Sequence, residues 1–303
     1  MNRNLINKKS IAVGIILLFV GICFIPSTAT SLRSGPNTAP SLGIFFGLNS
    51  HLAIYWDANV TEEPIIPRGG IRTVCLDIPF WITWGLFGRL INYLLRYKLV
   101  TITLSVVDKP EWSTTALSQG TVFLSIPPKE NVNEIGHTQL SVAVYENAPA
   151  FALLPVTIQA TIEPVHGLFG LLTVLQGTTQ VTDVTFTVAY KPLIQPIYPQ
   201  TNIIETPPLI PVELPIGIQN LGNGRTTVVN EIVDYPEGWI VTIPAQLMLE
   251  VGGYNEMNLS IVAPFNFSGQ ETITVSFTPH SSDDYTLVGQ TIYATFIAYY
   301  HPR

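Results

Sequence analysis

The sequence contains few charged residues. Asp, Glu, Lys and Arg make up 12% of its 303 residues, whereas hydrophobic residues make up 47%. A soluble globular domain usually carries about twice that charged share. The composition excludes intrinsic disorder, which requires low hydrophobicity and high net charge. It also excludes a long coiled coil, which needs abundant Glu, Lys and Ala.

Cysteine is also scarce, with two residues in the whole chain. Cys23 lies in an N-terminal apolar run, so Cys75 is the one thiol in the remainder. A single thiol forms no internal disulfide, and the fold must therefore be stable through burial of its core. Because Cys75 lies in the strand-like run Ile71–Leu76, we expect a small buried hydrophobic residue. A disulfide between two chains is the alternative.

The first thirty residues have the order of parts of a secretory signal. The basic residues Arg3, Lys8 and Lys9 precede an apolar run at 11–25, and small residues follow it. The run is short for a membrane span. We predict that residues 1–30 are a signal peptide, with an uncleaved anchor as the alternative. The protein is thus expected to be extracellular or at the cell surface.

The charge and the sequons agree with that location. Removal of three basic residues with the signal changes the net charge from −7 to −10. An acidic chain lacks the clustered Lys and Arg that nucleic acid binding requires, so no nucleic acid partner is expected. Three sequons are candidate N-glycosylation sites, at Asn59, Asn258 and Asn266.

Proline and glycine divide the chain into short segments. The 24 Pro and 22 Gly predict short strands joined by turns rather than long helices. Six prolines in 191–211 indicate an extended, semi-rigid linker. It separates a domain at 41–190 from one at 212–300. We predict an all-β fold with two immunoglobulin-like β-sandwich domains in tandem, the first with an inserted amphipathic helix.

The second domain contains recognisable turn sequences. Asn223-Gly224 is typical of a tight hairpin, because both residues adopt positive φ readily. Tyr235–Trp239 places a Trp after a Pro turn, and an upstream segment, Val107–Trp112, has the same Pro-Glu and Trp after a strand. In both segments we expect the Trp to pack on the core.

These turns resemble a known family. Asn220–Gly224, Tyr235–Trp239, Gly252-Gly253 and Pro264–Gly269 are similar to the NEW3-type domain over about 212–300. The resemblance implies an immunoglobulin-like module that accompanies secreted glycosidases and recurs in archaeal surface proteins. Its motifs are turn and core positions, so it implies no catalytic residues.

An amphipathic helix is predicted over 81–97. Its apolar residues recur at helical spacing; they are Trp84, Phe87, Ile91, Leu94 and Leu95. Arg89, Asn92 and Arg96 are expected on the opposite face. One interpretation of this pattern is a peripheral membrane or partner contact; the candidate residues are Trp81, Trp84, Phe87, Arg89 and Arg96.

A second interpretation of the same region is favoured. Three apolar segments flanked by Gly, at 43–48, 85–90 and 167–172, would cover one another at the open end of the first sandwich. Exposed apolar patches are rare on soluble monomers, which is the reason for this preference.

Catalytic and metal-binding patterns are weak. The five histidines are scattered and belong to no zinc motif, and no cofactor motif is present. The adjacent carboxylates Glu62-Glu63 and Asp283-Asp284 lie in polar turns and are expected to be solvated. We predict that the protein is not an enzyme and uses no cofactor.

The sequence therefore predicts an exported, non-enzymatic structural or adhesion protein whose partner is a cell-envelope protein or glycan. The alternative is an accessory carbohydrate-binding module that uses tyrosines near the C-terminus, with Tyr293 and Tyr299 expected to pack inward. A secreted hydrolase is the least favoured class.

Overall fold

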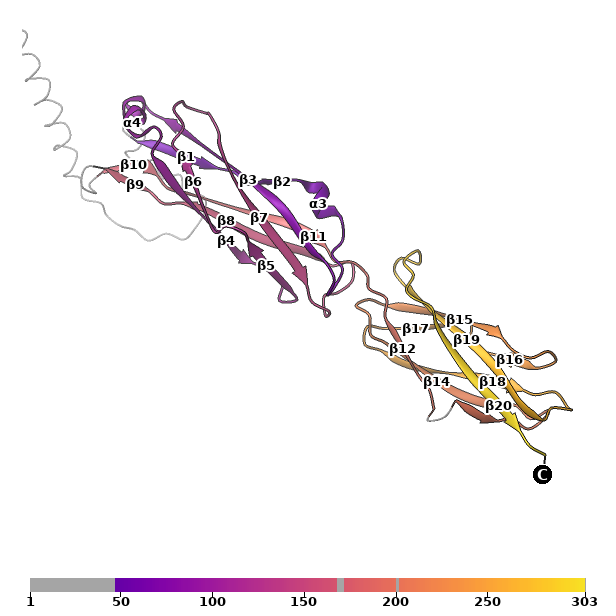
Figure 1. Ribbon diagram of the computed structural model, residues 1–303. Helices are drawn as coiled ribbons and strands as arrows, with labels where there is room; N and C mark the ends of the chain where they lie inside the picture. The colour runs from indigo at the N-terminus through magenta and orange to yellow at the C-terminus, as the bar shows by residue number, and fades with distance from the viewer. Residues whose placement is uncertain (1–46, 168–171, 200–201, 303) are drawn as a thin grey trace, which may run out of the picture. The chain divides into compact units, whose positions relative to one another are not determined.

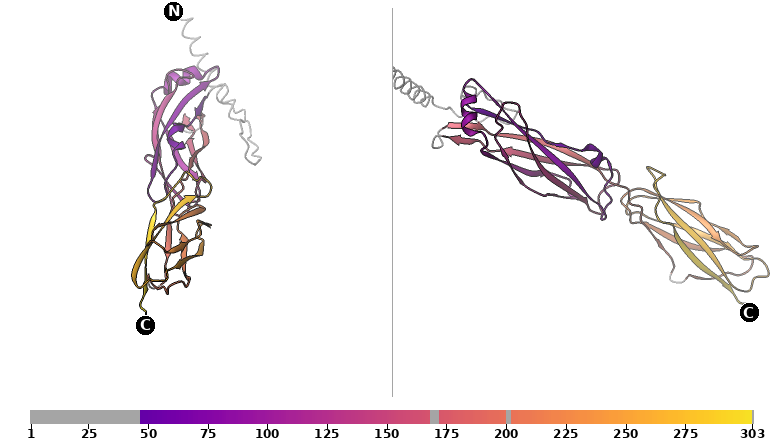
Figure 2. Two further views of the ribbon diagram at one scale, coloured as in Figure 1. Left: turned by 90° about the vertical axis from the view of Figure 1, so that its right-hand side faces the viewer. Right: turned by 45° about the horizontal axis from the view of Figure 1, so that its top comes forward.

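The computed structural model describes residues 47–167, 172–199 and 202–302 and confirms the all-β fold. These residues form two β-sandwiches, each with its own hydrophobic core (Figure 1). The predicted signal peptide lies outside the described residues. In the views of Figure 2, the two sheets of each sandwich are stacked face to face.

The first sandwich pairs a seven-stranded sheet, in the order β5-β7-β3-β1-β10-β9 with β2 beside β3, with a four-stranded sheet, β11-β8-β4-β6. Its strands are β1 (Leu48–Leu52), β2 (Tyr55–Trp56), β3 (Ile71–Trp84), β4 (Leu99–Asp108), β5 (Ser113–Leu117), β6 (Thr121–Ser125), β7 (Glu134–Val144), β8 (Leu153–Ile162), β9 (Val165–Gly167), β10 (Leu172–Gln176) and β11 (Thr178–Thr187). Its helices are α3 (Ala58–Glu62) and α4 (Gly88–Leu95).

The second sandwich pairs a four-stranded sheet, β12-β14-β18-β16, with a five-stranded sheet, β13-β20-β19-β15-β17. Its strands are β12 (Ile194–Ile197), β13 (Ile203–Glu205), β14 (Val212–Asn220), β15 (Thr226–Asp234), β16 (Ile240–Thr242), β17 (Gln246–Leu249), β18 (Tyr254–Val262), β19 (Gly269–Ser281) and β20 (Ile292–Tyr300). The pairs β1–β10 and β13–β20 are parallel.

Both cores are formed by strands in which inward-facing apolar residues alternate with outward-facing residues. Along β8, Leu154, Val156 and Ile158 are fully buried, whereas the residues between them face outward. Successive strand residues point to opposite faces, so every second residue enters the space between the sheets. Phe80 and Phe186 are the largest fully buried side chains of the first core; Phe277 and Phe296 are those of the second.

The two Pro-Trp segments occupy equivalent places in the two sandwiches. A β-bulge precedes each, between Val106 and Asp108 in β4 and between Ile232 and Asp234 in β15. Trp239 is buried and contacts Phe267 edge-on, with ring centroids 4.6 Å apart. Trp112 is partly buried against the first core. The expectation that both tryptophans pack on a core is confirmed.

The predicted linker is partly wrong. Residues 194–197 form β12, which pairs with β14, and residues 203–205 form β13, which pairs with β20. Both strands lie at sheet edges, where Pro196 is tolerated because an edge strand has one unpaired side. Ile194 and Ile204 are buried in the second core. Much of the proline-rich segment therefore belongs to the second sandwich.

The predicted hairpin at Asn223-Gly224 is also wrong. The strands it joins, β14 and β15, pair with other strands and belong to opposite sheets. Gly224 is needed for close approach, since a Cβ there would lie 2.9 Å from both Ala150 Cβ and Tyr190 Cδ2. At Gly222 a Cβ would lie 2.6 Å from the carbonyl oxygen of Lys191. The turn is a crossover between sheets.

Asn223 holds this crossover to the chain that precedes β12. Its Nδ2 donates to the carbonyl oxygens of Ala148 and Ala189, at 3.1 and 2.9 Å. Its Oδ1 accepts from the Lys191 N–H at 2.7 Å, and its carbonyl oxygen accepts from the Ala150 N–H. The buried side-chain amide thus satisfies three polar groups of loops that lie outside the sheets, and the backbone carbonyl of Asn223 satisfies a fourth.

Two local predictions in the first sandwich need correction. Cys75 is exposed, because Val74 and Leu76 take the inward positions of β3. The predicted helix at 81–97 is shorter, since residues 81–84 continue β3 and pair with β1. Pairing with a strand distant in sequence outweighs the local helical spacing.

We predict that Gly224→Ala destabilises the protein by about 1–3 kcal/mol, because the added methyl group overpacks the contact with Ala150. Urea denaturation checks this value. Gly120→Ala is the matched control, because its Cβ would have no neighbour closer than 3.6 Å. Equal effects of the two substitutions would contradict the close-approach explanation.

Candidate functional site

Helix α4 is held to the first sandwich by one of its faces. Gly88 is buried, and an ideal Cβ there would lie 2.2 Å from Trp84 Cβ, so only glycine lets the helix start so close to β3. Ile91 and Leu95, at the next turns of this face, pack against the core. A helix with 3.6 residues per turn brings these three positions onto one side.

The same face contains Asn92, which was expected opposite the apolar residues. Its side chain is 3% exposed, and Nδ2 donates to the Pro128 carbonyl oxygen at 3.1 Å. Its backbone carbonyl oxygen accepts from the Arg96 N–H and ends the helix. Leu94, expected on the same face as Ile91 and Leu95, is 67% exposed instead. The helix is therefore rotated relative to the prediction.

The rotation leaves an apolar surface in solvent. Six side chains on and beside α4 are 61–79% exposed; they are Leu86, Leu90, Tyr93, Leu94, Tyr97 and Leu99. Within the helix, Leu90, Tyr93 and Leu94 follow the i, i+3, i+4 spacing of a single stripe. We call these six residues the α4 apolar face. Helix α4 thus has two apolar sides, one on the core and one in solvent.

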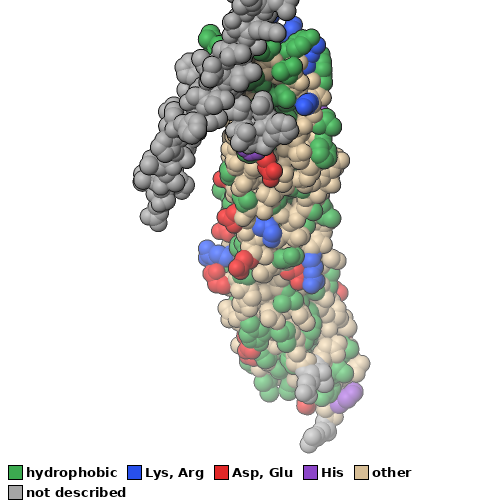
Figure 3. Space-filling model, turned by 90° about the vertical axis from the view of Figure 1, so that its left-hand side faces the viewer, with side chains coloured by type: hydrophobic (Ala, Val, Ile, Leu, Met, Phe, Trp, Pro, Cys, Tyr) green, Lys and Arg blue, Asp and Glu red, His purple; other side chains and the backbone are tan. Residues whose placement is uncertain are grey.

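Positive charge borders the α4 apolar face. Arg89, Arg96 and Lys98 are exposed, and the sequence contains no acidic residue between Asp77 and Asp108. The Arg96 guanidinium lies 4.2 Å from the centroid of the Tyr93 ring, a cation–π distance. In the space-filling view, hydrophobic and basic side chains gather at the same end (Figure 3).

These cations are not neutralised by ion pairs within the described part of the chain. The ion pairs found there involve Arg68, Arg72, His137 and Arg225. The nearby carboxylate of Glu130 accepts instead from the Trp84 N–H at 3.2 Å. The face therefore combines exposed apolar groups with free positive charge.

The candidate contact residues do not all lie together. Phe87 is 47% exposed, and Arg89 and Arg96 border the α4 apolar face. Trp84 is partly buried against the core beneath the helix. Trp81 stacks on His51, with ring centroids 5.4 Å apart, on the outer side of the sheet. The exposed stripe has a sequence signal, because Leu90, Tyr93 and Leu94 are spaced i, i+3 and i+4 when counting starts at residue 90 and not at Trp84.

The expectation that the Gly-flanked segments cover one another is wrong for 85–90, where Leu86 is 79% exposed and Leu90 65%. Residues 43–46 and 168–171, which form much of the other two segments, lie outside the described residues. The described helices have five and eight residues, and neither is long enough to cross a bilayer.

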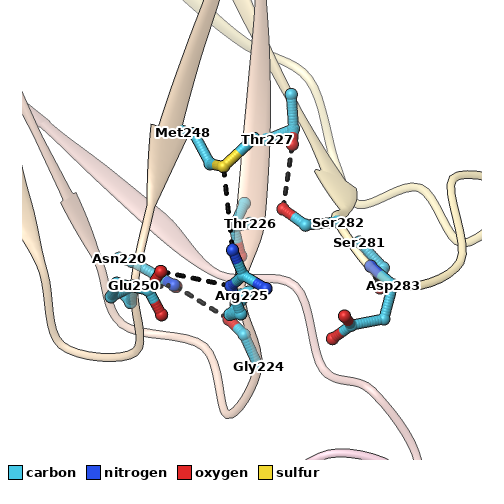
Figure 4. Close-up of polar contacts among 10 residues, drawn as sticks. All are labelled: Asn220, Gly224, Arg225, Thr226, Thr227, Met248, Glu250, Ser281, Ser282 and Asp283. Atoms are coloured by element: carbon cyan, nitrogen blue, oxygen red, sulfur yellow. Dashed lines mark hydrogen bonds and ion pairs between the residues drawn. The ribbon is translucent and has the colours of Figure 1, made fainter.

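A polar cluster in the second sandwich surrounds the β14–β15 crossover (Figure 4). Asn220 is fully buried, and its Nδ2 donates to the carbonyl oxygens of Gly224 and Glu250 at 2.9 and 3.0 Å. Arg225 pairs with the exposed Glu250 carboxylate at 3.1 Å. Thr227 and Ser282 share a hydrogen bond of 2.9 Å. These contacts satisfy polar groups of the loops and account for the geometry of the turn without a ligand.

The paired carboxylates have ordinary structural partners. The Arg72 guanidinium holds the pKa of Glu63 below its usual value, and hydrogen bonds from Thr286 lower the pKa of Asp284. Both groups are ionised at neutral pH and are unsuited to act as general acids. The described residues include no group of three or more His, Cys, Asp or Glu arranged to hold a metal ion.

The tyrosines of the second sandwich that were considered for sugar stacking, which include Tyr254, do not all lie on one sheet. Tyr254 belongs to β18 and Tyr293 to β20, which are parts of opposite sheets. Tyr293 is 64% exposed rather than inward, because Ala294 and Phe296 take the buried positions. These two rings therefore form no common platform for a sugar.

The three sequon asparagines are all exposed. Asn59 lies in α3, where its N–H donates to the Asp57 side chain at 3.0 Å. Asn258 lies within β18, and Asn266 lies in the loop between β18 and β19.

No protein-family model and no curated protein matches the sequence. Among solved structures, similarity is found to the human desmocollin-1 ectodomain, with 12% identity and a TM-score of 0.32 over 67% of this chain and 35% of that one. A PapD-like domain of human CEP192 has 12% identity and a TM-score of 0.29 over 36% and 86%. A Porphyromonas gingivalis protein of unknown function has 13% identity and a TM-score of 0.28, over 82% of this chain and 99% of that one. These scores are too low to carry an argument about function.

We predict that Ile91→Ala lowers the free energy of unfolding by about 1–2 kcal/mol, because Ile91 is half-buried against the core. Leu94→Ala should change it by less than about 0.5 kcal/mol, because that side chain is exposed. Urea denaturation followed by tryptophan fluorescence compares the two. A Leu94→Ala loss as large as that of Ile91→Ala would show that the α4 apolar face is packed.

Proposed function

We propose that the protein is an exported, non-enzymatic β-sandwich protein of the cell surface that binds another envelope component. The α4 apolar face is the observation that carries this proposal. Six exposed apolar side chains on one short segment are unusual for a soluble surface, and large patches of this kind mark interaction sites.

The fold itself does not require this exposed face. Gly88, Ile91 and Leu95 already attach α4 to the sandwich through the opposite side of the helix. Solvent-facing leucine at positions 90 and 94 adds nothing to the core. A binding role gives these residues a physical reason, because their burial against a partner would remove apolar surface from water.

Export is supported by the sequence. The order of basic, apolar and small residues in 1–30 is that of a secretory signal. Outward strand positions are rich in threonine, as along β11, where few charges would otherwise keep the surface soluble. As part of the proposal, the exposed residues Asn59, Asn258 and Asn266 accept glycans.

The second sandwich is proposed as a NEW3-like structural module. The Trp239–Phe267 contact joins two of the segments on which the resemblance depends, and it serves the core. The module would then support the first sandwich, which carries the α4 apolar face.

A photo-cross-linking side chain placed at Leu90 tests the proposal in intact cells. We expect it to form adducts with an envelope protein, glycan or lipid. The same side chain at Tyr293, which is 64% exposed on the second sandwich, should form few. The adducts are read by mass shift on a gel and by mass spectrometry. Absence of adducts from position 90, with the protein present at the surface, would overturn the proposed function.

A further inference from the structure

We propose that the partner of the α4 apolar face is the surface of a lipid bilayer with anionic head groups. The inference rests on the proposed function, since it names the chemistry of the partner that this face binds. Helix α4 would lie in the plane of the interface, with its outer stripe among the upper parts of the lipid chains.

The dimensions of the face suit an interfacial helix. Eight helical residues extend over roughly 12 Å. Leu90 and Leu94 stand one turn apart on the outer stripe, and Leu86 and Leu99 extend the apolar surface beyond the helix ends. An interfacial helix inserts by roughly 5–10 Å, about the depth of one layer of side chains.

The aromatic and basic residues match the layer above the lipid chains. Tyr93 and Tyr97 have an apolar ring and a polar hydroxyl, a combination that is favourable at the head-group level. Arg96 lies over the Tyr93 ring, so its charge is kept beside the apolar stripe. Arg89 and Lys98 add two further exposed cations.

The charge distribution favours an anionic surface and orients the protein on it. From residue 47 onward the sequence has 21 acidic residues and nine basic ones before Arg303, and three of those nine are Arg89, Arg96 and Lys98. An anionic bilayer would repel most of the molecule and attract this end. The combination of apolar and basic groups on one segment is thus complementary to an anionic membrane.

A second copy of the chain fits this face less well. Two-fold dimers bring the same patch of both subunits together. Arg89, Arg96 and Lys98 would then face their own copies without a described acidic partner. A like-charge contact of this kind opposes association.

The test uses the exported protein, with the N-terminus it carries, and vesicles of phosphatidylcholine with or without 30% phosphatidylglycerol, a proportion of about one anionic lipid in three. Flotation measures the bound fraction at several salt concentrations. We expect binding to the anionic vesicles that weakens with salt, and little binding to the neutral ones.

Two double variants separate the apolar and the charged contributions. Leu90→Ser/Leu94→Ser should lower the partition coefficient at least about tenfold. Arg89→Gln/Arg96→Gln should lower it about 25-fold on anionic vesicles only, at about fivefold per charge. Met248→Ser/Tyr293→Ser removes two exposed side chains from the second sandwich and is the matched control, with binding unchanged. Circular dichroism and urea denaturation should show that all variants fold alike.

If the apolar run at 11–25 is retained, it could bind vesicles by itself. A measurement at α4 alone is therefore needed. A fluorescent side chain sensitive to polarity, placed at Leu90, should shift to shorter wavelength with anionic vesicles, whereas one at Tyr293 should not. Either no shift at position 90 or equal losses in the control variant would overturn the lipid inference.

The outcomes distinguish this inference from the proposed function. Cross-linking from Leu90 to an envelope protein or glycan, without vesicle binding, would overturn the lipid inference and leave the proposed function in place. A concentration-dependent dimer lost in Leu90→Ser/Leu94→Ser would identify a second copy as the occupant and overturn the lipid inference. Failure of both cross-linking and vesicle binding would overturn both proposals.

Discussion

Burial of alternate strand residues between two sheets is the constraint on which the rest of the structure depends. In the described part of the chain no disulfide supports the fold, and the one thiol there, Cys75, is exposed. Each strand therefore places apolar residues inward at every second position, as β8 and β20 do. The outward positions carry threonine, serine, a few charges and scattered apolar residues such as Ile71, Leu153 and Tyr293. A chain with 47% hydrophobic and 12% charged residues is the consequence.

The same constraint determines what the loops must do. Chain segments that pass between sheets leave the hydrogen-bonded ladders, and their buried polar groups need other partners. Asn220 and Asn223 supply these partners with their side-chain amides. Gly222 and Gly224 allow the backbone to come close enough for those bonds to form. The Asn223-Gly224 sequence thus allows the crossover to pack closely and to satisfy its buried polar groups.

Helix α4 differs from the strands, because it carries apolar residues on two sides. One side of the helix is occupied by the core, yet leucine and tyrosine also cover the other side. Arginine and lysine border that outer side without a described ion-pair partner. Because the fold does not need these residues, the helix is the part of the first sandwich where a contact with another surface is the better explanation. The polar clusters elsewhere are accounted for by internal hydrogen bonds.

The sequence by itself determined the fold class and many of the strands, because alternation with period two is a local property. It also identified Trp239 as a core residue. The basic character of the segment around α4 was also visible, since the sequence contains Arg89 and Arg96 and no acidic residue between Asp77 and Asp108.

Only the tertiary structure decided which segments pair and which side of a helix is buried. Residues 194–197 and 203–205 became edge strands because β14 and β20 offer them partners that local sequence does not reveal. Asn92 is buried because the Pro128 carbonyl accepts its hydrogen bond, and this rotation turns Leu94 to solvent. The candidate site therefore arises from contacts between residues distant in the chain, and no local periodicity contains that information.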